Sequence, residues 1–445
     1  MPTRRVAVVG GGITGAVAAS ALAPVCEVHV YDQGRRGPGG RASHRTVDPS
    51  THAVLADSDA PPPGALEFDH GCQFLRADDA RMRTLAAEWV DRGICAAWRG
   101  RFGTVGDGAS PFFGLPTSAA PVYVGVGGMH RVPRRVLEAS GATVHAGVRV
   151  SGLRRVAAAD GGPPQWALLG VGGAAAFHDT AEAVAAATEA AALGAPFDAV
   201  LLTDVSSSFA NWHRASAGVP ESLAARVRER VRVPLFAAMV AFAEPLGLAL
   251  DGINFGDGAP VWWASRTQSK PGLEGGAAEC WTLVSTPAFA VDEITAVPMQ
   301  DAATGAFRPQ EDSYLNSGPA PALLRAFTDA VAHLRPAEAP LPRVVYLQGQ
   351  RWGSALPAPT DVGGRDATGR GAGTVRVLDV AYERSTPPLT FDRAPAAAGA
   401  ADYAADEGER LFYAGDFTSR RAPGFEAAAL SGLDAASALK RVLGV

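Results

Sequence analysis

Short apolar segments on either side of a glycine-rich turn open the chain. Residues 5–9 (RVAVV) form an apolar run that predicts a buried strand, and the small apolar residues at 16–22 predict a helix. Residues 27–31 predict a second strand, which ends at Asp32. This order of strand, turn, helix and strand within about 30 residues indicates a Rossmann-type unit of an α/β protein.

The turn of this unit carries the spacing GxGxxG at Gly10, Gly12 and Gly15. The first glycine permits a tight turn, the second lets the backbone approach a pyrophosphate, and the third lets the helix pack closely on the strand. The start of the helix offers unpaired N–H groups and partial positive charge to phosphates. Asp32 follows Gly10 by 22 residues, where an acid binds a ribose hydroxyl and disfavours the 2′-phosphate of NADP. The sequence therefore predicts a dinucleotide site.

The rest of the chain combines apolar runs with segments of low complexity. Residues 197–203 (FDAVLLT) and 411–414 each predict a buried strand, and a helix is expected to start within 423–426. An Ala-rich segment predicts either an inserted surface helix or a disordered loop, and segments rich in Gly, Pro, Ala or Asp predict loops or linkers. These segments are 174–194, and then 57–64, 363–373 and 394–405.

Composition excludes several classes of protein. The 445 residues carry a net charge of −5, with 47% hydrophobic and 19% charged residues, which is typical of a soluble globular protein of more than one domain and gives no reason to expect a nucleic-acid partner. The four cysteines form no CxxC pair, which argues against a disulfide framework and favours a reducing compartment. The sequence contains no run of about 18 apolar residues, so no membrane-spanning helix is expected. We expect a cytoplasmic protein, or an organellar one if a presequence was removed.

Three segments indicate which dinucleotide is bound, namely GRRGPGGRASHR (34–45), FDHGCQFL (68–75) and the C-terminal residues 410–439. With these, the sequence resembles the flavin amine oxidase superfamily and, within it, the renalase-like branch. The GGR at 39–41 resembles the signature that lies along the pyrophosphate and flavin. The Gly-Asp at 415–416 resembles the pair whose acid binds the ribityl chain, and it is followed by a helix that faces the flavin. Residues 125–137 resemble the segment that returns to the FAD domain, and residues 261–272 and 350–357 resemble substrate-domain strands of the same branch.

FAD is the cofactor that this resemblance implies. Reduced flavin carries negative charge that a helix N-terminus stabilises, which suits the helix expected after Asp416. Because no cysteine follows Cys280, the covalent attachment found in some relatives has no partner here, and we expect FAD to be bound non-covalently. The expected cofactor-binding residues are Gly10, Gly12, Ile13, Thr14, Gly15, Asp32, Gln33, Gly39, Gly40, Arg41, Gly71, Gln73, Phe74, Val150, Gly415, Asp416, Gly424, Phe425, Glu426 and Ala428.

Cofactor motifs at both ends of the chain predict two discontinuous domains. The Rossmann-type FAD-binding domain is expected to comprise residues 1–75, 126–215 and 406–445. Residues 76–125 and 216–405 are expected to form a smaller substrate domain with a mainly antiparallel sheet. The segments at about 174–194 and 358–405 resemble insertions in this plan.

The resemblance also implies a reaction. Renalase-like enzymes oxidise isomers of NAD(P)H that are reduced at ring position 2 or 6, and the flavin passes the electrons to oxygen, which gives hydrogen peroxide. Three alternatives stay open: an amine oxidase or desaturase acting on a small amine or apolar ring compound, a non-catalytic FAD-binding module, and an NAD-dependent dehydrogenase. Asp416 and the helix after it disfavour the last of these.

Few side chains stand out as catalytic candidates. Lys270, one of only two lysines, could act near the flavin, but its loop RTQSKPG favours an ordinary surface position. His70 is expected to make a structural hydrogen bond rather than transfer a proton. Trp263 and Trp352 could line an aromatic substrate pocket or belong to the core. No metal site is expected, because the nine histidines show no HxH or HxxxH spacing.

Overall fold

The structure is a computed structural model of the whole chain, which divides into two compact units. The first unit comprises residues 1–40, 132–231 and 393–445, and the second comprises 41–131 and 232–392. The residues that the structure describes are 3–34, 36–106, 121–158, 161–172, 191–204, 220, 223, 232–256, 258–298, 311–336, 338–357, 374–377, 380–383 and 401–445. Most of the two expected insertions, 174–194 and 358–405, lies outside them.

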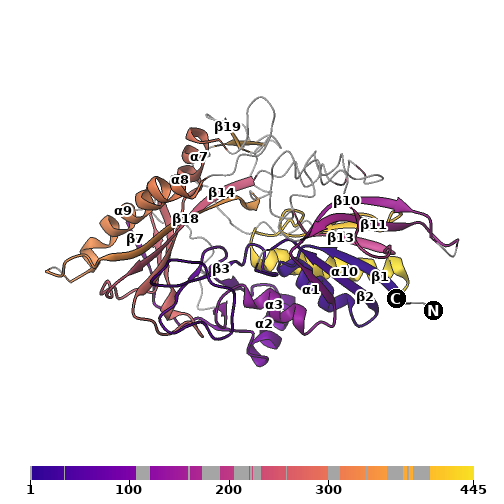
Figure 1. Cartoon of the computed structure of the whole chain (residues 1–445), viewed down its shortest axis with the longest axis horizontal. Helices are drawn as coiled ribbons and strands as arrows, with labels where there is room; N and C mark the ends of the chain where they lie inside the picture. Colours follow the sequence, from indigo (N-terminus) through magenta and orange to yellow (C-terminus); the bar gives the residue numbers. More distant parts are fainter. Residues whose placement is uncertain are drawn as a thin grey trace. The chain divides into compact units, whose positions relative to one another are not determined.

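A six-stranded sheet forms the centre of the first unit, in the order β21-β22-β13-β1-β2-β9 (Figure 1). Five strands run parallel, and the edge strand β21 runs antiparallel to β22. The four inner strands, β22, β13, β1 and β2, are largely buried because both faces of such a sheet are covered. Their bounds are β1 Arg4–Val9, β2 Cys26–Asp32, β9 Thr143–Ala146, β13 Ala199–Leu202, β21 Tyr403–Asp406 and β22 Leu411–Ala414.

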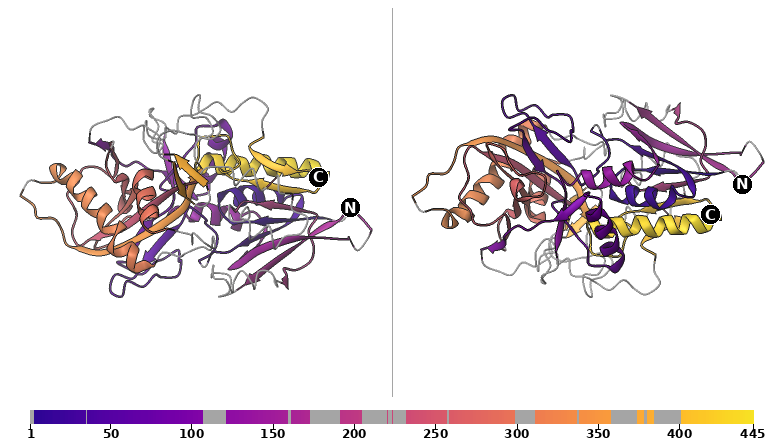
Figure 2. Two further views of the ribbon diagram at one scale, coloured as in Figure 1. Left: turned by 90° about the horizontal axis from the view of Figure 1, so that it is seen from above. Right: turned by 90° about the horizontal axis from the view of Figure 1, so that it is seen from below.

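Two helices from opposite ends of the chain lie side by side on this sheet, α1 (Ile13–Leu22) and α10 (Phe425–Leu443) (Figure 2). Gly432 of α10 faces the backbone of Thr14, and a Cβ at position 432 would fall inside contact distance of the Thr14 carbonyl oxygen. The missing side chain therefore allows the two helices to approach closely. Helix α3 (Arg131–Glu138) lies before β9 in the sequence.

A second, antiparallel sheet contributes to the core of the first unit. It consists of β10 (Val148–Val156), β11 (Gln165–Gly172) and β12 (Ala191–Ala192). Trp166 is fully buried in a cluster with apolar residues of the parallel sheet, among them Val200 and Tyr413. Burial of such aromatic surface supplies much of the stabilisation of a core of this kind.

The second unit is built on another six-stranded sheet, in the order β18-β14-β17-β16-β15-β7. Neighbouring strands are antiparallel except for β15 and β7, which run parallel. Helices α7 and α9 contact β14, and helices α8 and α9 contact β18 (Figure 1). The bounds are β7 Phe102–Val105, β14 Arg232–Phe242, β15 Gly252–Phe255, β16 Val261–Arg266, β17 Glu279–Ser285, β18 Val344–Pro357, α7 Pro287–Ala296, α8 Asp312–Ser317 and α9 Pro319–Val331.

Smaller elements complete the second unit. A hairpin of β3 and β4 lies against the large sheet, where Phe68 and Leu66 bury themselves with Met239 and Cys280. The remaining elements are β5 Leu75–Arg76, β6 Cys95–Ala97, β8 Val122–Gly125, α2 Ala80–Asp91, β19 Thr374–Val377, β20 Val380–Glu383 and two short 3₁₀ helices, Thr267–Ser269 and Ala332–Leu334, in addition to β3 His44–Val47 and β4 Leu66–Asp69.

The predicted fold class is confirmed. The expected strands at 5–9, 27–31, 197–203 and 411–414 correspond to β1, β2, β13 and β22, and the helix expected to start within 423–426 begins at Phe425. The first unit has the Rossmann-type parallel sheet, and the sheet of the second unit is mainly antiparallel. The second unit, however, spans more residues than the first and is not the smaller of the two.

The unit boundaries also differ from the expected domains. Residues 41–75 belong to the second unit, because the β3–β4 hairpin buries its apolar face against β14 and β17 and because the Ser265 hydroxyl donates a hydrogen bond to the Gln73 side chain at 2.8 Å. Residues 393–405 belong to the first unit, where β21 extends the parallel sheet by pairing with β22. The first difference arises from packing between segments far apart in the sequence, which composition does not reveal, and the second arises from the pairing of β21 with β22.

Candidate cofactor and active site

The glycine turn between β1 and α1 has the geometry of an anion-binding helix start. Gly10 adopts a φ of 107°, which favours glycine, and a Cβ at Gly15 would collide with the Gly10 carbonyl oxygen. Gly12 is the N-cap of α1, and no side chain caps the helix there. The first N–H groups of α1 therefore have no capping side chain and are suited to bind an anion such as a phosphate.

Asp32 lies at the end of β2 and is 7% exposed. Its carboxylate accepts hydrogen bonds from the backbone N–H groups of Gly11 at 2.7 Å and Gly34 at 2.8 Å. Burial raises the pKa of Asp32, and these two hydrogen bonds oppose that rise by stabilising the charged form. Asp32 thus fixes the shape of the glycine turn, and each of its oxygens has further lone pairs for a ribose hydroxyl.

The C-terminal motif reaches the same edge of the same sheet. Because β22 runs parallel to β13 and β1, Gly415 and Asp416 follow the carboxyl end of β22 just as the glycine turn follows β1. A Cβ built on Gly415 would lie 3.7 Å from the Thr14 hydroxyl. Asp416 is 2% exposed, and α10 begins after Gly424 without a capping side chain.

Three further residues support this motif and were missed in the sequence. The Gly415 N–H donates to the Ser431 hydroxyl at 2.8 Å, and that hydroxyl donates to the carbonyl of Asp402 at 2.6 Å. The Asp402 carboxylate accepts from the side chain of Arg421 at 2.7 Å. These partners lie up to 29 residues apart, and no local spacing indicates them. Thr203 was missed because its partner is also distant in the sequence. Its hydroxyl donates a hydrogen bond to the carbonyl of Val9 at 2.8 Å.

The expected cofactor-binding residues fall into two groups, one in each unit. The first unit holds the glycine turn, Asp32 and the C-terminal motif. The members of the first group are Gly10, Gly12, Ile13, Thr14, Gly15, Asp32, Gln33, Gly39, Gly40, Val150, Gly415, Asp416, Gly424, Phe425, Glu426 and Ala428. The members of the second group are Arg41, Gly71, Gln73 and Phe74.

The second group forms a tightly bonded segment of its own. A Cβ at Gly71 would collide with the Arg41 carbonyl oxygen, which also accepts a hydrogen bond from the Cys72 N–H at 2.8 Å. Gln73 is 1% exposed, and its amide donates to the carbonyls of Asp69 and Gly71. The FDHGCQF segment is therefore held by contacts within itself and by the carbonyl of Arg41.

The expected surface position of Lys270 is wrong. This side chain is 2% exposed, and its ammonium group lies 2.9 Å from the Asp69 carboxylate and 5.3 Å from the ring centre of Trp98. A short 3₁₀ helix, Thr267–Ser269, ends directly before Lys270. A buried lysine requires such a partner, since an unpaired charge in the interior is strongly destabilising.

Of the aromatic and histidine candidates in the second unit, His70 and Trp263 are buried, and Trp352 is partly exposed. The Trp352 indole N–H donates to the His70 carbonyl at 2.8 Å, and the two rings are stacked with centres 5.6 Å apart. Trp263 is fully buried and contacts the rings of Phe74 and Trp98. The packing of Trp263 matches the core interpretation of that residue, and the buried His70 has a structural aromatic contact.

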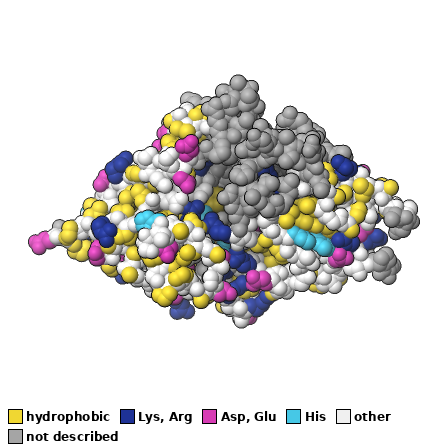
Figure 3. Space-filling model, viewed as in Figure 1, with side chains coloured by type: hydrophobic (Ala, Val, Ile, Leu, Met, Phe, Trp, Pro, Cys, Tyr) yellow, Lys and Arg dark blue, Asp and Glu magenta, His cyan; other side chains and the backbone are white. Residues whose placement is uncertain are grey.

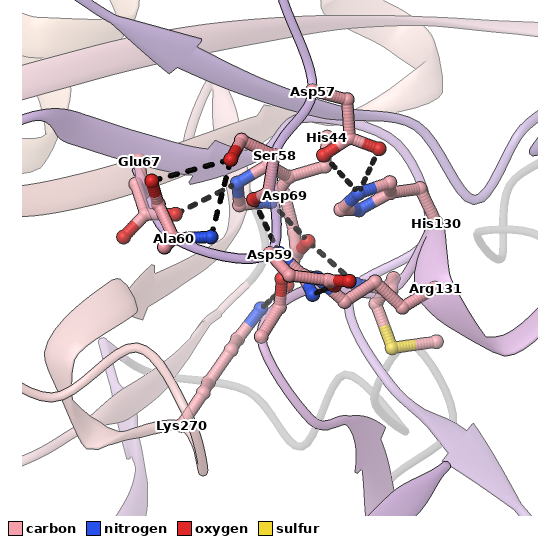
Figure 4. Close-up of polar contacts among 12 residues, drawn as sticks. His44, Asp57, Ser58, Asp59, Ala60, Glu67, Asp69, His130, Arg131 and Lys270 are labelled. Atoms are coloured by element: carbon pink, nitrogen blue, oxygen red, sulfur yellow. Dashed lines mark hydrogen bonds and ion pairs between the residues drawn. The ribbon is translucent and has the colours of Figure 1, made fainter. Parts of the chain in front are cut away.

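A buried polar cluster surrounds Asp69 and was not anticipated. Figure 4 shows His44, Glu67 and Asp69 of the β3–β4 hairpin together with Lys270 and His130. His44 Nδ1 lies 2.9 Å from the Asp69 carboxylate. In the sequence, only the alternation polar-apolar-polar at Glu67, Phe68 and Asp69 could have signalled that both acids share one face of a strand.

Other chemistries find little support in the described part of the chain. Burial raises the pKa of Cys72 and Cys95 to about 12 and that of Cys280 to about 11, so these thiols stay protonated near neutral pH. Within the described residues, no group of three or more His, Cys, Asp or Glu side chains could hold a metal ion. None of the described helices is long and apolar enough to cross a membrane. Acidic and basic side chains both occur across the face in Figure 3.

Comparison with known proteins supports the fold. Residues 8–89 match the family model described as an NAD(P)-binding Rossmann-like domain. A solved structure of reduced UDP-galactopyranose mutase is 12% identical, with a TM-score of 0.56 over 99% of this chain and 96% of that chain. A putrescine oxidase double mutant with redesigned cofactor binding is 13% identical, with a TM-score of 0.49 over 100% of both chains. The likeness to the mutase shows a shared fold.

Replacing Asp32 with alanine is expected to weaken dinucleotide binding and to loosen the turn. The substitution removes the acceptor of the Gly11 and Gly34 N–H groups as well as a ribose contact. The expected loss in binding free energy is about 1–3 kcal/mol, the cost of leaving buried polar partners unsatisfied. Titration of the apoprotein with FAD, followed by flavin fluorescence, measures this loss. Asp32→Asn keeps one acceptor oxygen, so its affinity for FAD should lie between that of the natural protein and that of Asp32→Ala. An unchanged affinity in both variants would contradict the assignment of Asp32 to the ribose.

Proposed function

We propose that this protein is an FAD-dependent oxidoreductase of the flavin amine oxidase superfamily. The observation that carries the proposal is the meeting of two distant motifs at one sheet edge of the first unit. The glycine turn and the Gly415–Asp416 pair follow parallel strands, and each is succeeded by a helix start that no side chain caps. FAD is long enough to need a second polar site beyond the pyrophosphate turn, and it would supply the redox chemistry when bound.

Each part of the site has a task in holding FAD. The N-terminus of α1 would bind the pyrophosphate, and Asp32 would bind the adenosine ribose. Asp416 would accept from a ribityl hydroxyl, and the N-terminus of α10 would stabilise negative charge on the flavin ring. Arg41, Gly71 and Phe74 of the second unit are assigned to the flavin only by the resemblance.

We further propose that the substrate is a planar, reduced heteroaromatic compound, such as the 2- or 6-dihydro isomers of NAD(P)H. The resemblance to the renalase-like branch supports this choice, with oxygen as the electron acceptor and hydrogen peroxide as product. A dihydronicotinamide donates hydride without first losing a proton, so it requires no general base. Lys270, the lysine considered for a role near the flavin, is paired with the Asp69 carboxylate in the interior. Four free cysteines suit the cytoplasm or another reducing compartment.

Anaerobic mixing of the FAD-loaded protein with candidate reductants tests this proposal. We expect the 2- or 6-dihydro isomers to bleach the flavin absorbance, whereas NADH and a panel of amines should leave it oxidised or react far more slowly. Admission of oxygen should then restore the absorbance and produce hydrogen peroxide. A flavin that no reductant bleaches would point instead to a non-catalytic FAD-binding module.

An amine oxidase is the second candidate, because the burial of Lys270 beside Trp98 gives the protein an interior lysine among aromatic rings. An amine must be neutral to be oxidised, so its rate of flavin reduction should rise with pH through the pKa of the amine. Bleaching by an amine with this pH dependence, and no reaction with dihydronicotinamides, would establish the second candidate.

The proposed FAD is expected to be non-covalent. The described cysteines are all free, and each lies before the C-terminal motif. Acid precipitation should therefore release the yellow colour into the supernatant. Colour that stays with the pellet would show that another side chain carries a covalent bond.

A further inference from the structure

Four ionisable groups meet in the interior of the second unit at the end of the β3–β4 hairpin (Figure 4). Asp69 is 1% exposed, and the side chains of His44 and Lys270 are 3% and 2% exposed. The side chain of Glu67 is 19% exposed and provides the outer edge of the group. His44 and Asp69 are cross-strand partners, and Glu67 shares the face of Asp69 because side chains alternate along a strand.

The Asp69 carboxylate accepts hydrogen bonds from three donors. Lys270 Nζ lies 2.9 Å from one oxygen, and the other oxygen accepts from His44 Nδ1 and from the Met129 N–H, each at 2.9 Å. Burial alone would raise the pKa of Asp69, but Lys270 and the hydrogen bond from His44 hold this pKa well below its ordinary value. Asp69 is therefore a carboxylate, and His44 must carry a proton on Nδ1 to donate to it.

The second nitrogen of His44 faces another acid. Its Nε2 lies 3.5 Å from the Glu67 carboxylate, a position that favours a protonated nitrogen. Burial opposes charge on His44, but the hydrogen bonds and charges of Asp69 and Glu67 outweigh burial and raise the pKa of His44. With His44 as an imidazolium, two cations balance two carboxylates, and the group as a whole is neutral.

The neighbouring His130 is compatible with a charged His44. Its ring stacks on that of His44 with centres 4.8 Å apart, and burial together with the charge of His44 lowers the pKa of His130 to about 3. His130 is thus neutral and donates from Nε2 to the Asp57 carboxylate at 3.0 Å. The neighbouring Arg131 forms its ion pair with Asp59 rather than with Asp69 or Glu67.

We propose that His44 is a positioning residue whose imidazolium, together with the Lys270 ammonium, holds the Asp69 carboxylate and so keeps Lys270 as a fixed interior cation. Any effect of the Lys270 ammonium on flavin reduction rests on the proposed function. The position of this ammonium beside Asp69 does not depend on that function. A neutral His44 would leave Asp69 and Glu67 with one cation between them, and the Asp69 carboxylate would be held less firmly beside Lys270. Since the pKa of His44 is raised in the folded protein, this stabilisation is complete below a pH of about 6.5, the pKa of an exposed histidine, and is lost as the pH rises through the folded-state pKa.

Lysine labelling offers a direct test, because the chain contains only Lys270 and Lys440. In FAD-loaded protein labelled with ¹⁵N-lysine, we expect a slowly exchanging ammonium signal from Lys270, while the partly exposed Lys440 of α10 serves as the internal reference. His44→Gln retains an N–H donor without the charge and should broaden or abolish this signal at neutral pH. His44→Arg keeps a cation and should preserve the signal to higher pH than in the natural protein. An identical Lys270 signal in His44→Gln over the whole pH range would overturn the proposal.

The rate of anaerobic flavin reduction provides the second readout. We expect His44→Gln to lower kcat on the order of 10-fold with little change in KM, as for a misplaced group outside direct substrate contact. The natural protein should lose rate on the alkaline side, and His44→Arg should not. The exposed His333→Gln serves as the matched control and should behave as the natural protein. If no reductant bleaches the flavin, the proposed function fails, and the lysine signal alone then decides whether His44 positions Lys270.

Discussion

Replacement of Asp69 by alanine is expected to lower the free energy of unfolding by about 3–5 kcal/mol, the cost of removing one partner of a buried ion pair. The variant would leave the Lys270 ammonium and His44 in the interior without their shared carboxylate. It would also remove the acceptor of the Met129 N–H. Chemical denaturation of purified protein at neutral pH measures this change.

Two further variants separate lost charge from lost volume. Asp69→Asn preserves the shape of the side chain but not its charge, so most of the destabilisation should remain. The double variant Asp69→Leu with Lys270→Met removes both charges and should be more stable than Asp69→Ala, because no unpaired ammonium stays buried. A double variant that is as unstable as Asp69→Ala would show that packing, not the ion pair, accounts for the loss.

Substitution of Gly15 by alanine is the second change with a large expected effect. The new Cβ would collide with the Gly10 carbonyl oxygen, and neither backbone can move without distorting β1 or α1. The expected cost to the free energy of unfolding is about 1–3 kcal/mol for an overpacked site, and FAD content should fall with it.

Gly12→Ala is the matched control within the same turn. A Cβ on Gly12 would lie 3.9 Å from the Cα of Gly40, which is an ordinary contact distance. The φ of Gly12 is −72°, which suits alanine. The apoprotein should therefore keep its stability, whereas the affinity for FAD should fall about 10-fold, equivalent to about 1.4 kcal/mol, because the methyl group blocks the approach of the pyrophosphate. Equal effects on stability from both substitutions would contradict the separate tasks assigned to Gly12 and Gly15.

Local sequence patterns were sufficient for the elements that hold the proposed cofactor. A run of apolar residues that ends in GxGxxG predicts a strand, a turn and a helix, because the apolar run and the glycine spacing are both local features of the sequence. The strand at Leu411–Ala414 and the helix beginning at Phe425 were predicted from similarly short patterns. In these segments the residue types and the backbone geometry determine each other directly.

Contacts between distant segments could not be predicted in the same way. The loop RTQSKPG has the composition of a surface turn, yet Lys270 is buried because Asp69, 201 residues earlier in the chain, meets it in the folded unit. Gly432 has no special local environment in its sequence, and only the approach of α10 to the Thr14 backbone explains the missing side chain. The place of residues 41–75 in the second unit likewise depends on the pairing of β3 with β4 and on their burial against β14 and β17.

The sequence by itself therefore determined the Rossmann-type unit, its glycine turn and the C-terminal strand and helix. Only the tertiary structure decided the charge environment of Lys270, the pairing of His44 with Asp69 and the division between the two units. The physical reason is the range of the interactions. Glycine geometry and strand or helix periodicity act within one turn or strand, whereas a buried ion pair depends on strand register and on which faces become covered.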